Sequence, residues 1–498
     1  MARLLAALVV LGFTAAALAV DPPKPNVVFF IADDLGWGDV GFHGAAIRTP
    51  NLDRLANEGV ELERYYVFPV CSPTRAALYT GRSAQRMGIT APLSTTSAGP
   101  PLTEHLLPES FRAAGYQTSL VGKWHLGGGS PERLPHRRGF DAFYGLTGGG
   151  VGYFTHGGWK DNRPDWWRND EPLQETGYST DLIADEAVRV VEKRDPQRPL
   201  FLCVAFNAPH EPWQAPPEAI AKYSGDTRTA TYSAMIEIMD AGIGRVLDAL
   251  DRAGLRTNSI VLFFSDNGAA GNGPGSSRPW RDAKATVFEG GIHVPAILHW
   301  PAKLPAGAKS AQTMTVMDVF PTVAAAAGVT PKNMLPFDGE NLWPALLAGK
   351  PVAHQPFIIG AMNALAVRED NWKLVRARGT SALFDVIADP SETTDLAQKY
   401  PEILARLAAR AGAFTRDLPP TIVLGSRVPG GAARRPVGGQ IRSPVARALD
   451  LNGDGELTDD EMNQAPESLK KLDRNSDGRL SRDEWTPAPV QSANRPNQ

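Results

Sequence analysis

Short apolar runs that end in polar residues of catalytic type are the feature that most constrains the fold of this chain. They lie at 27–32, 118–122, 200–206 and 259–264. Longer stretches of helical pattern separate them, and this alternation favours an α/β fold around a largely parallel sheet. In open sheets of this kind, ligands bind beyond the carboxyl ends of the strands. The polar residues after the four runs are therefore expected to face one crevice.

Two of these runs end in oxygen-rich pairs. Asp33 and Asp34 follow the first run, and Asp266 and Asn267 follow the last. Hard divalent cations take oxygen ligands, so this set suits calcium or magnesium better than zinc. A single Asp-Asp pair after a strand is more often a turn or a helix cap. Two such pairs in this order indicate a metal site.

Lysine and histidine follow the other two runs. Lys123 and His125 come after the second run, His210 follows the third, and Lys284 lies further along the chain. Cleavage of an anionic ester requires its negative oxygens to be neutralised and its leaving oxygen to be protonated, and these side chains suit both tasks. Each is ambiguous alone, because exposed lysines are usually solvated and single histidines are usually structural.

The run Cys71-Ser72-Pro73-Thr74-Arg75 predicts a helix start that can hold an anion. Pro73 suits the first helical turn, where its fixed φ is favourable and no backbone donor is needed. Cys71 would then lie among the unpaired N–H groups of the helix start. Arg75, one turn on, could bind an oxyanion with two hydrogen bonds. For this motif alone, an ordinary buried thiol is the competing interpretation.

The pattern Cys-x-Pro-x-Arg resembles the modification signature of the type I sulfatases, and the resemblance covers roughly residues 25–418. Further motifs typical of that family occur in family order at 29–39, 49–55, 115–125, 208–212, 265–268 and 284–291. The overall sequence pattern is similar to that of the arylsulfatase and N-acetylgalactosamine-sulfatase branch of this family. Two positions depart from the pattern. Tyr79 replaces an aliphatic residue, Phe or Trp, and Asp282-Ala283 replaces a small pair before Lys284.

This resemblance implies an alkaline-phosphatase-like α/β sandwich, with formylglycine formed from Cys71 as the nucleophile. It implies one calcium ion held by Asp33, Asp34, the modified residue at position 71, Asp266 and Asn267. Arg75 and Lys123 would stabilise the formylglycine. His125 would take the proton from its remaining hydroxyl, and His210 and Lys284 would bind the sulfate and assist the leaving oxygen. A formylglycine-generating enzyme or an equivalent maturase is the implied partner during biogenesis.

The expected activity is hydrolysis of an organic sulfate monoester, with a sulfated glycan as the expected substrate. The segment 148–168 is rich in glycine and aromatic residues, and aromatic faces suit sugar rings. Packing of this loop over the domain is the other interpretation. Two other functions stay open: a phosphonate or phosphate ester hydrolase of the same superfamily, and a calcium-dependent binding protein without catalytic activity.

The sequence divides into a catalytic domain at 24–347, a small α+β subdomain at 348–420 and a flexible linker at 421–444 that is rich in Gly, Pro and Arg. Periodicity predicts the longer helices of the catalytic domain at 49–58, 178–193 and 231–253. In the subdomain it predicts strands at 372–375 and 382–385 and a helix at 401–414.

The segment 445–487 contains two tandem EF-hand loops. Oxygen ligands recur at alternate positions, followed by the required glycine and a terminal glutamate. The predicted ligand positions are Asp450, Asn452, Asp454, Glu456 and Glu461 in the first loop, and Asp473, Asn475, Asp477, Arg479 and Glu484 in the second. The pair is expected to bind two calcium ions, in addition to the one in the catalytic domain.

The first 19 residues predict a secretory signal peptide. A short basic start precedes an apolar run over 4–18, and Ala17-Leu18-Ala19 offers a cleavage site. No later segment approaches the length of a membrane span. The protein is therefore expected to be periplasmic or extracellular, without an integral membrane segment. A formal net charge of -3 gives no general attraction to nucleic acid.

Two cysteines are too few for a disulfide framework, although one bridge is possible. Cys203 lies within an apolar run of strand type, which predicts a packed core residue. Cys71 would then be an unpaired thiol in an exported protein, which is unusual unless it has a chemical function.

Overall fold

The computed structural model describes residues 23–332, 334–377, 379–419, 449, 464–471 and 473. The chain forms two units, residues 1–424 and 425–498, which are described separately. The predicted signal peptide and linker, and every predicted EF-hand ligand except Asp473, lie outside the described residues. In the second unit, helix α13 (Ala465–Lys470) lies between the two predicted EF-hand loops.

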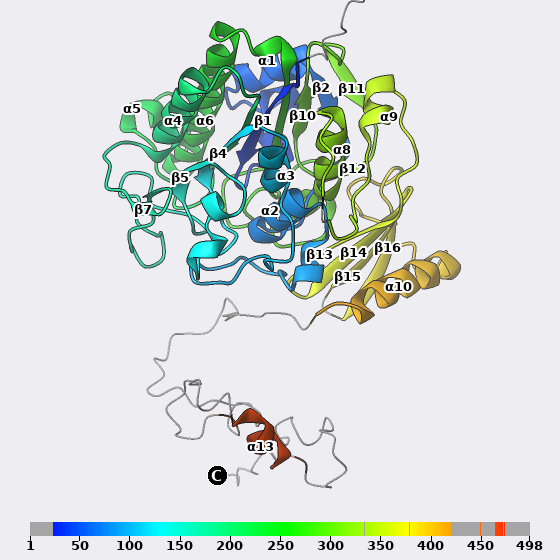
Figure 1. Ribbon diagram of the computed structural model, residues 1–498. Coiled ribbons are helices and arrows are strands. Elements are labelled where there is room, and N and C mark those ends of the chain that lie inside the picture. Colours follow the sequence, from blue (N-terminus) through cyan, green and yellow to red (C-terminus); the bar gives the residue numbers. More distant parts are fainter. Residues whose placement is uncertain are drawn as a thin grey trace, which may run out of the picture. The chain divides into compact units, whose positions relative to one another are not determined.

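In the described part of the first unit, a ten-stranded sheet forms the centre (Figure 1). The strand order is β11-β2-β10-β9-β1-β8-β4-β5-β6-β7. In that order the strands are β11 (Ala308–Ser310), β2 (Val60–Leu62), β10 (Ala296–His299), β9 (Ser259–Ser265), β1 (Asn26–Ala32), β8 (Leu200–Ala205), β4 (Gln117–Lys123), β5 (Ala142–Leu146), β6 (Trp167–Arg168) and β7 (Glu171–Pro172).

The centre of this sheet is parallel. β1 pairs with β9 on one side and with β8 on the other, and β8 pairs in the same direction with β4. These four strands correspond to the four apolar runs, and they are neighbours in the sheet. Antiparallel pairing occurs where β10 joins β9 and β2, and where β6 joins β5 and β7. The predicted α/β fold with a mostly parallel central sheet is confirmed.

Helices cover both faces of the sheet. Alternate side chains of β1 point to opposite faces and belong to two separate cores. Val27, Phe29 and Ile31 belong to one core, and Val28 and Phe30 belong to the other. The first core includes residues of α2 (Cys71–Thr80), α3 (Leu107–Ala113), α8 (Val319–Ala326) and α9 (Trp343–Ala348). The second includes residues of α1 (Pro50–Glu58), α4 (Ser179–Lys193), α5 (Pro217–Ile220) and α6 (Thr227–Arg252).

Helix α6 begins earlier than the helix predicted at 231–253. Its first residue is Thr227, because the side chain of Asp226 accepts a hydrogen bond from the Thr229 N–H at 3.0 Å and caps the helix there. The apolar periodicity becomes clear only one turn further on, so it missed this first turn. Helices α1 and α4 each begin one residue inside their predicted ranges.

A second, four-stranded antiparallel sheet follows in the described chain, in the order β13 (Phe357–Ala361), β14 (Ala364–Glu369), β15 (Trp372–Ala377) and β16 (Thr380–Asp385). Side chains of α10 (Pro401–Arg416), such as Leu407, pack with Leu374 on one face. On the other face, Val375 and Phe384 pack with Val287 of the catalytic domain. This sheet therefore lies directly against the segment that carries Lys284.

Neither cysteine forms a disulfide. Cys203 is buried in β8, as predicted, and its Sγ lies 3.2 Å from the hydroxyl of Tyr79. Tyr79 also packs against the rings of Trp124 and Phe140. The departure from the sulfatase pattern at position 79 therefore lies in the core behind α2.

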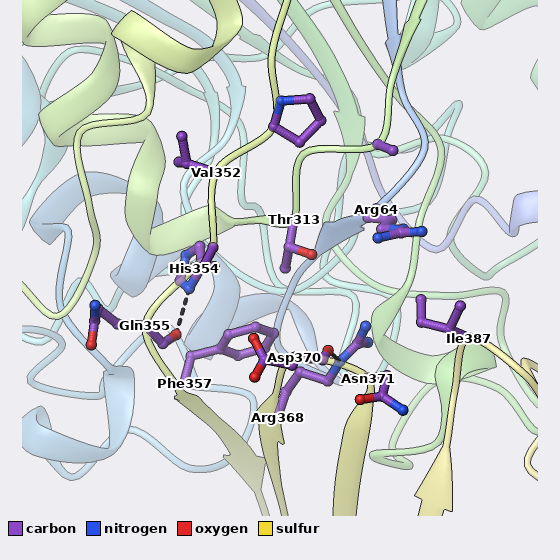
Figure 2. Close-up of a pocket in the computed structure, with 13 residues that line it drawn as sticks. Arg64, Thr313, Val352, His354, Gln355, Phe357, Arg368, Asp370, Asn371 and Ile387 are labelled. Atoms are coloured by element: carbon purple, nitrogen blue, oxygen red, sulfur yellow. Dashed lines mark hydrogen bonds between the residues drawn. The ribbon is translucent and has the colours of Figure 1, made fainter.

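A cavity of about 300 Å³ lies beside the second sheet (Figure 2). Arg368 and Asn371 line it from that sheet, and Thr313 and His354 line it from the segments before the sheet. His354 is almost completely buried, and its Nε2 lies 2.9 Å from Oδ2 of Asp318. Burial opposes protonation of His354, but the hydrogen bond and charge of Asp318 outweigh it and raise its pKa to about 9.

We expect His354→Gln to destabilise the protein at pH 6 but not at pH 10. The His354–Asp318 pair contributes fully below the usual histidine pKa of about 6.5, and this contribution is lost as the pH rises through about 9. The difference at pH 6 is expected to reach up to about 3 kcal/mol. Urea unfolding of both proteins at the two pH values measures it. An equal difference at both values would show that the charge on His354 does not contribute.

Candidate active site

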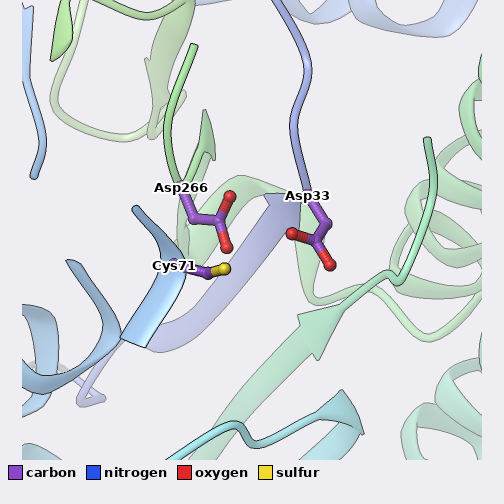
Figure 3. Close-up of side chains that lie close together, drawn as sticks. All are labelled: Asp33, Cys71 and Asp266. Carbon is purple, nitrogen blue, oxygen red and sulfur yellow. The ribbon is translucent and has the colours of Figure 1, made fainter. Parts of the chain in front are cut away.

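The structure brings the predicted site residues together at the carboxyl ends of the four central strands. Asp33 and Asp34 follow β1, Lys123 ends β4, and Asp266 and Asn267 follow β9. Cys71 is the first residue of α2, as predicted from Pro73. Figure 3 shows the side chains of Cys71, Asp33 and Asp266 turned toward one another, and their ligand atoms all lie within 4.8 Å of each other.

Three buried carboxylates pair with three cationic side chains. Arg75 donates to Oδ2 of Asp266 from Nε at 3.1 Å and from Nη2 at 2.8 Å. Lys123 Nζ donates to Oδ2 of Asp33 at 2.5 Å. Lys284 Nζ donates to both carboxylate oxygens of Asp34, at 2.6 and 2.8 Å. Formal charges in this set therefore balance, as burial of ionised groups requires.

Two buried oxygens in the site have no hydrogen-bond donor among the described residues. They are Oδ1 of Asp33 and Oδ1 of Asn267. The Asn267 amide is oriented by its Nδ2, which donates to Oδ1 of Asp34 at 2.7 Å and to the Gly268 carbonyl at 2.9 Å. Unpaired buried oxygens are costly, and a hard cation is bound by oxygens of this kind. The donor set thus fits calcium or magnesium.

Backbone geometry at two site residues is unusual for residues other than glycine. Asp34 has a φ of 69° and His125 a φ of 53°. Such left-handed conformations are sparsely populated and persist where surrounding contacts hold them. The Asp34 N–H donates to Oδ1 of Asp266 at 3.3 Å, and the His125 N–H donates to the Thr147 carbonyl at 3.2 Å. These bonds fix the direction of both side chains.

His125 presents one free ring nitrogen. Its Nε2 lies 2.8 Å from the Leu93 carbonyl, which can only accept, so Nε2 carries the hydrogen. Its buried Nδ1 has no partner among the described residues. Burial, together with the charge of Lys123, holds the pKa of His125 well below its usual value. Nδ1 is therefore unprotonated, and its lone pair is able to accept a proton.

His210 lies beside Asp34 and is held by its own backbone neighbourhood. Its Nδ1 lies 2.5 Å from the Glu211 carbonyl, and its Nε2 lies 3.7 Å from Oδ2 of Asp34. The Tyr153 hydroxyl lies 2.8 Å from the His210 carbonyl and 2.7 Å from that of Asn207. Burial lowers the pKa of His210 to about 3, against the opposing effect of Asp34. Tyr153, one of the aromatic residues of the segment 148–168, therefore supports His210 from inside the protein.

Burial and neighbouring charges separate the two adjacent aspartates. Burial raises the pKa of Asp33 to about 7, although Lys123 acts in the opposite direction. For Asp34, burial also disfavours the charge, but Lys284 and His210 outweigh it and hold the pKa below its usual value. Burial raises the pKa of the Cys71 thiol as well. An unmodified Cys71 would consequently be a protonated, weakly nucleophilic thiol.

The segment before Lys284 departs from the family pattern, and the structure places this departure at the surface. Asp282 is exposed, with a φ of 68°. The main chain of Lys284 is fixed by its N–H, which donates to the Ala269 carbonyl at 3.0 Å. The position of Lys284 is thus set by backbone contacts and does not depend on the side chain at 282.

Sequence reasoning missed the contacts of Ser72, the residue that follows Cys71 in α2. The Ser72 hydroxyl donates to the His125 carbonyl at 2.9 Å and accepts from the Leu93 N–H at 2.9 Å. Leu93 in turn binds the His125 ring through its carbonyl. Ser72 lies inside the Cys-x-Pro-x-Arg motif, but nothing in the sequence indicates its hydrogen bonds. Leu93 could not be identified from the sequence, because only its main chain makes these contacts.

Comparison with known proteins identifies the family. The model of the family described as "Sulfatase" matches residues 25–329. The chain belongs to the sulfatase family. This sulfatase also matches the family described as "EF hand" at 447–465 and 467–486, which agrees with the two predicted loops.

Relatives of the sulfatase are similar over most of their length. Arylsulfatase J of Mus musculus is 32% identical over 460 residues, covering 80% of this chain and 77% of the relative. N-acetylgalactosamine-6-sulfatase of Mus musculus is 36% identical over 402 residues, covering 74% of this chain and 75% of the relative. The crystal structure of Ps i-CgsB in complex with k-i-k-neocarrahexaose is 32% identical, with a TM-score of 0.77, covering 80% of this chain and 94% of the other.

Proposed function

We propose that this sulfatase hydrolyses sulfate monoesters of a glycan by means of a formylglycine formed from Cys71 and one calcium ion. The observation that carries the proposal is the pair of buried, unpartnered oxygens on Asp33 and Asn267 beside Cys71. Calcium binding would supply them with a partner. Asp34, Asp266 and the modified residue 71 complete the ligand set. When bound, the ion would polarise a sulfate oxygen and favour ionisation of the nucleophilic hydroxyl.

The charge balance of the site supports an anionic substrate. Asp33, Asp34 and Asp266 are matched by Arg75, Lys123 and Lys284, so a divalent cation would add two positive charges. A sulfate monoester brings one negative charge into this buried site. Opposite charges attract more strongly there than in bulk water. Arginine and two lysines also provide the donors that a transferring group with several oxygens requires.

Each proposed role follows from the position of a side chain. Arg75 and Lys123 pair with Asp266 and Asp33, the two carboxylates grouped with Cys71, and in this proposal they hold the hydrated form of residue 71. His125 takes the proton from the remaining hydroxyl through its free Nδ1. His210 and Lys284 lie together at Asp34, where they bind the sulfate and assist the leaving oxygen.

The proposed substrate class is a sulfated glycan. The relative named N-acetylgalactosamine-6-sulfatase and the structure solved with k-i-k-neocarrahexaose both carry carbohydrate names. In this chain, the loop 148–168 contributes both buried and exposed aromatic side chains next to His210. Exposed aromatic faces suit sugar rings.

We also propose that the protein is exported and that its EF-hand segment binds two further calcium ions. The basic and apolar start of the sequence supports export. None of the helices in the described part of the chain has both the length and the apolar composition needed to cross a bilayer. Binding of calcium by the EF-hand segment is supported by the two complete ligand patterns within 447–486.

We expect the protein that carries the modification at position 71 to hydrolyse 4-nitrophenyl sulfate faster than 4-nitrophenyl phosphate. Mass spectrometry of the peptide around Cys71 establishes the modification before the assay. Removal of calcium with a chelator should abolish turnover, and added calcium should restore it. Faster phosphate turnover would favour the phosphoester alternative. No turnover of either ester by modified, calcium-loaded protein would favour a binding protein.

A further inference from the structure

The loop 148–168 places one exposed tryptophan beside the catalytic site. Trp159 is 38% exposed, and its ring centroid lies 6.2 Å from that of His210, with the planes at 68°. Trp166 in the same loop is 1% exposed and stacks on His156 at 4.8 Å. The two tryptophans therefore differ in kind. Trp166 packs the loop, whereas Trp159 leaves much of its surface available next to His210.

The backbone fixes Trp159 in this position. Its N–H donates to the Gly150 carbonyl at 3.2 Å. The turn that follows is closed by two bonds, from Gly158 N–H to the Arg163 carbonyl at 2.7 Å and from Asn162 N–H to the Gly158 carbonyl at 2.6 Å. A loop whose main chain is already held in place loses little conformational freedom when a ligand binds.

Gly150 allows the contact between Trp159 and His210. A Cβ atom at Gly150 would lie 3.2 Å from Nδ1 of His210 and 3.2 Å from Cδ1 of Trp159, which is closer than ordinary van der Waals contact. The glycine backbone therefore passes directly between the catalytic histidine and the tryptophan. A Cβ atom at the preceding residue, Gly149, would lie 3.0 Å from Cε1 and Nε2 of the His125 ring.

An unpaired cation lies over the same ring. Lys160 Nζ is 4.8 Å from the Trp159 ring centroid, and the residue is exposed. Within the described ranges Lys160 has no ion pair, and the neighbouring Asp161 faces Arg163 at 3.6 Å. A rigid aromatic face with an adjacent ammonium group suits a ring that carries a further negative charge.

We propose that Trp159 and Lys160 form a subsite for the leaving group. Trp159 stacks on the sugar ring released by sulfate cleavage, and Lys160 binds an anionic substituent, a carboxylate or a second sulfate, on that ring or the next one. The inference rests on the proposed function, because it takes His210 as the residue that assists the leaving oxygen. The substrate class is thereby narrowed to glycans with more than one negative group.

The role of Trp159 is tested with 4-(hydroxymethyl)phenyl sulfate. Trp159→Ala should raise KM about five- to tenfold, the range that aromatic contacts contribute, with kcat changed less than about twofold. Trp159→Phe should restore most of the affinity. Inhibition by inorganic sulfate should not change, because sulfate has no ring. Phe154→Ala is the matched control, since Phe154 is 48% exposed in the same loop but packs on Tyr178.

The role of Lys160 is tested with 4-carboxyphenyl sulfate and 4-sulfophenyl sulfate, in which the sulfonate represents a second sulfate. Wild type should bind one or both of them about threefold more tightly than the hydroxymethyl ester, and Lys160→Gln should remove this preference. The ester whose binding weakens more in Lys160→Gln identifies the anion that the subsite prefers.

Several outcomes would overturn the subsite. An unchanged KM in Trp159→Ala would exclude stacking, and a parallel weakening of inorganic sulfate inhibition would place Trp159 in the sulfate pocket instead. A preference that survives in Lys160→Gln would exclude the role of the ammonium group. If modified wild type hydrolysed none of the aryl sulfates, the proposed function itself would be wrong, which separates the two failures.

Discussion

Cys71→Ala is expected to lower kcat for sulfate esters by more than about a thousandfold, the loss typical when a covalent nucleophile is removed. The substitution removes the one side chain that is proposed to become formylglycine, and the other cysteine, Cys203, lies in the core against Tyr79. Turnover of 4-nitrophenyl sulfate measures the loss. Residual activity above about a thousandth of wild type would contradict covalent catalysis at position 71.

The same variant should remain folded. The Cys71 side chain is small and makes no hydrogen bond to another described side chain, so truncation leaves only a small cavity, with a cost of about 1 kcal/mol. Cys203→Ala is the matched control, because Cys203 is equally buried but contacts Tyr79 in the core. We expect that control to lose stability of similar size and to retain turnover. Thermal unfolding of both variants separates the effects.

Local patterns in the sequence were sufficient for the central strands and for the start of α2. A buried parallel strand such as β1 is apolar on both faces, and Pro73 suits the first turn of a helix whatever surrounds it. Positions of Asp33 and Asp266 in the site followed from topology, since parallel neighbours end at the same edge of a sheet. The carboxylate positions were therefore predictable without any knowledge of their partners.

The pairing of charges was not predictable in this way. Three cations and three carboxylates can pair in several combinations, and the observed partners are far apart in sequence. Lys284 and Asp34 are separated by 250 positions. The choice depends on how the segment 281–289 is held. The carbonyls of Ala269 and Pro69 bind the main chain of Lys284 and Ala285, and Val287 packs on the second sheet. Such a contact is not predictable from the spacing of residues in the sequence.

The aromatic residues of the loop 148–168 illustrate a similar limit. Composition alone does not show which of Tyr153, Trp159 and Trp166 is available to bind a sugar. Tyr153 and Trp166 are buried, whereas Trp159 is partly exposed. The Tyr153 hydroxyl bonds to the Asn207 and His210 carbonyls, and the Trp166 ring stacks on His156. A glycine-rich sequence permits many other arrangements. Only the folded loop separates the packing residues from the exposed one.

Between the catalytic domain and the second sheet lies a buried ionic cluster that no sequence motif indicated. Lys373 on β15 is 1% exposed, and its Nζ lies 2.8 Å from Oε1 of Glu289 and 2.9 Å from Oε1 of Glu392. Glu289 also accepts a hydrogen bond from the Tyr66 hydroxyl at 3.0 Å. The Glu289 N–H donates to Oε2 of Glu392 at 2.7 Å. Lys373 is thus the shared partner of two buried carboxylates.

Lys373→Met is expected to destabilise the protein by about 3 to 5 kcal/mol at pH 8, because it leaves two buried carboxylates without their shared cation. Urea unfolding measures this cost. Burial already raises the pKa of Glu392, and loss of the lysine raises it further, so Glu392 becomes protonated as the pH is lowered from 8 toward 5. The cost should therefore be smaller at pH 5.

Two further variants separate the buried charge from a general loss of packing. Adding Glu392→Gln to Lys373→Met should recover part of the stability at pH 8, because one uncompensated carboxylate is removed. Lys399→Met is the matched control, since Lys399 is an exposed lysine of the same subdomain whose Nζ lies over the Tyr400 ring, and it should change stability by less than about 0.5 kcal/mol. A cost below about 1 kcal/mol for Lys373→Met, or one that grows at pH 5, would show that buried charge pairing does not hold this interface together.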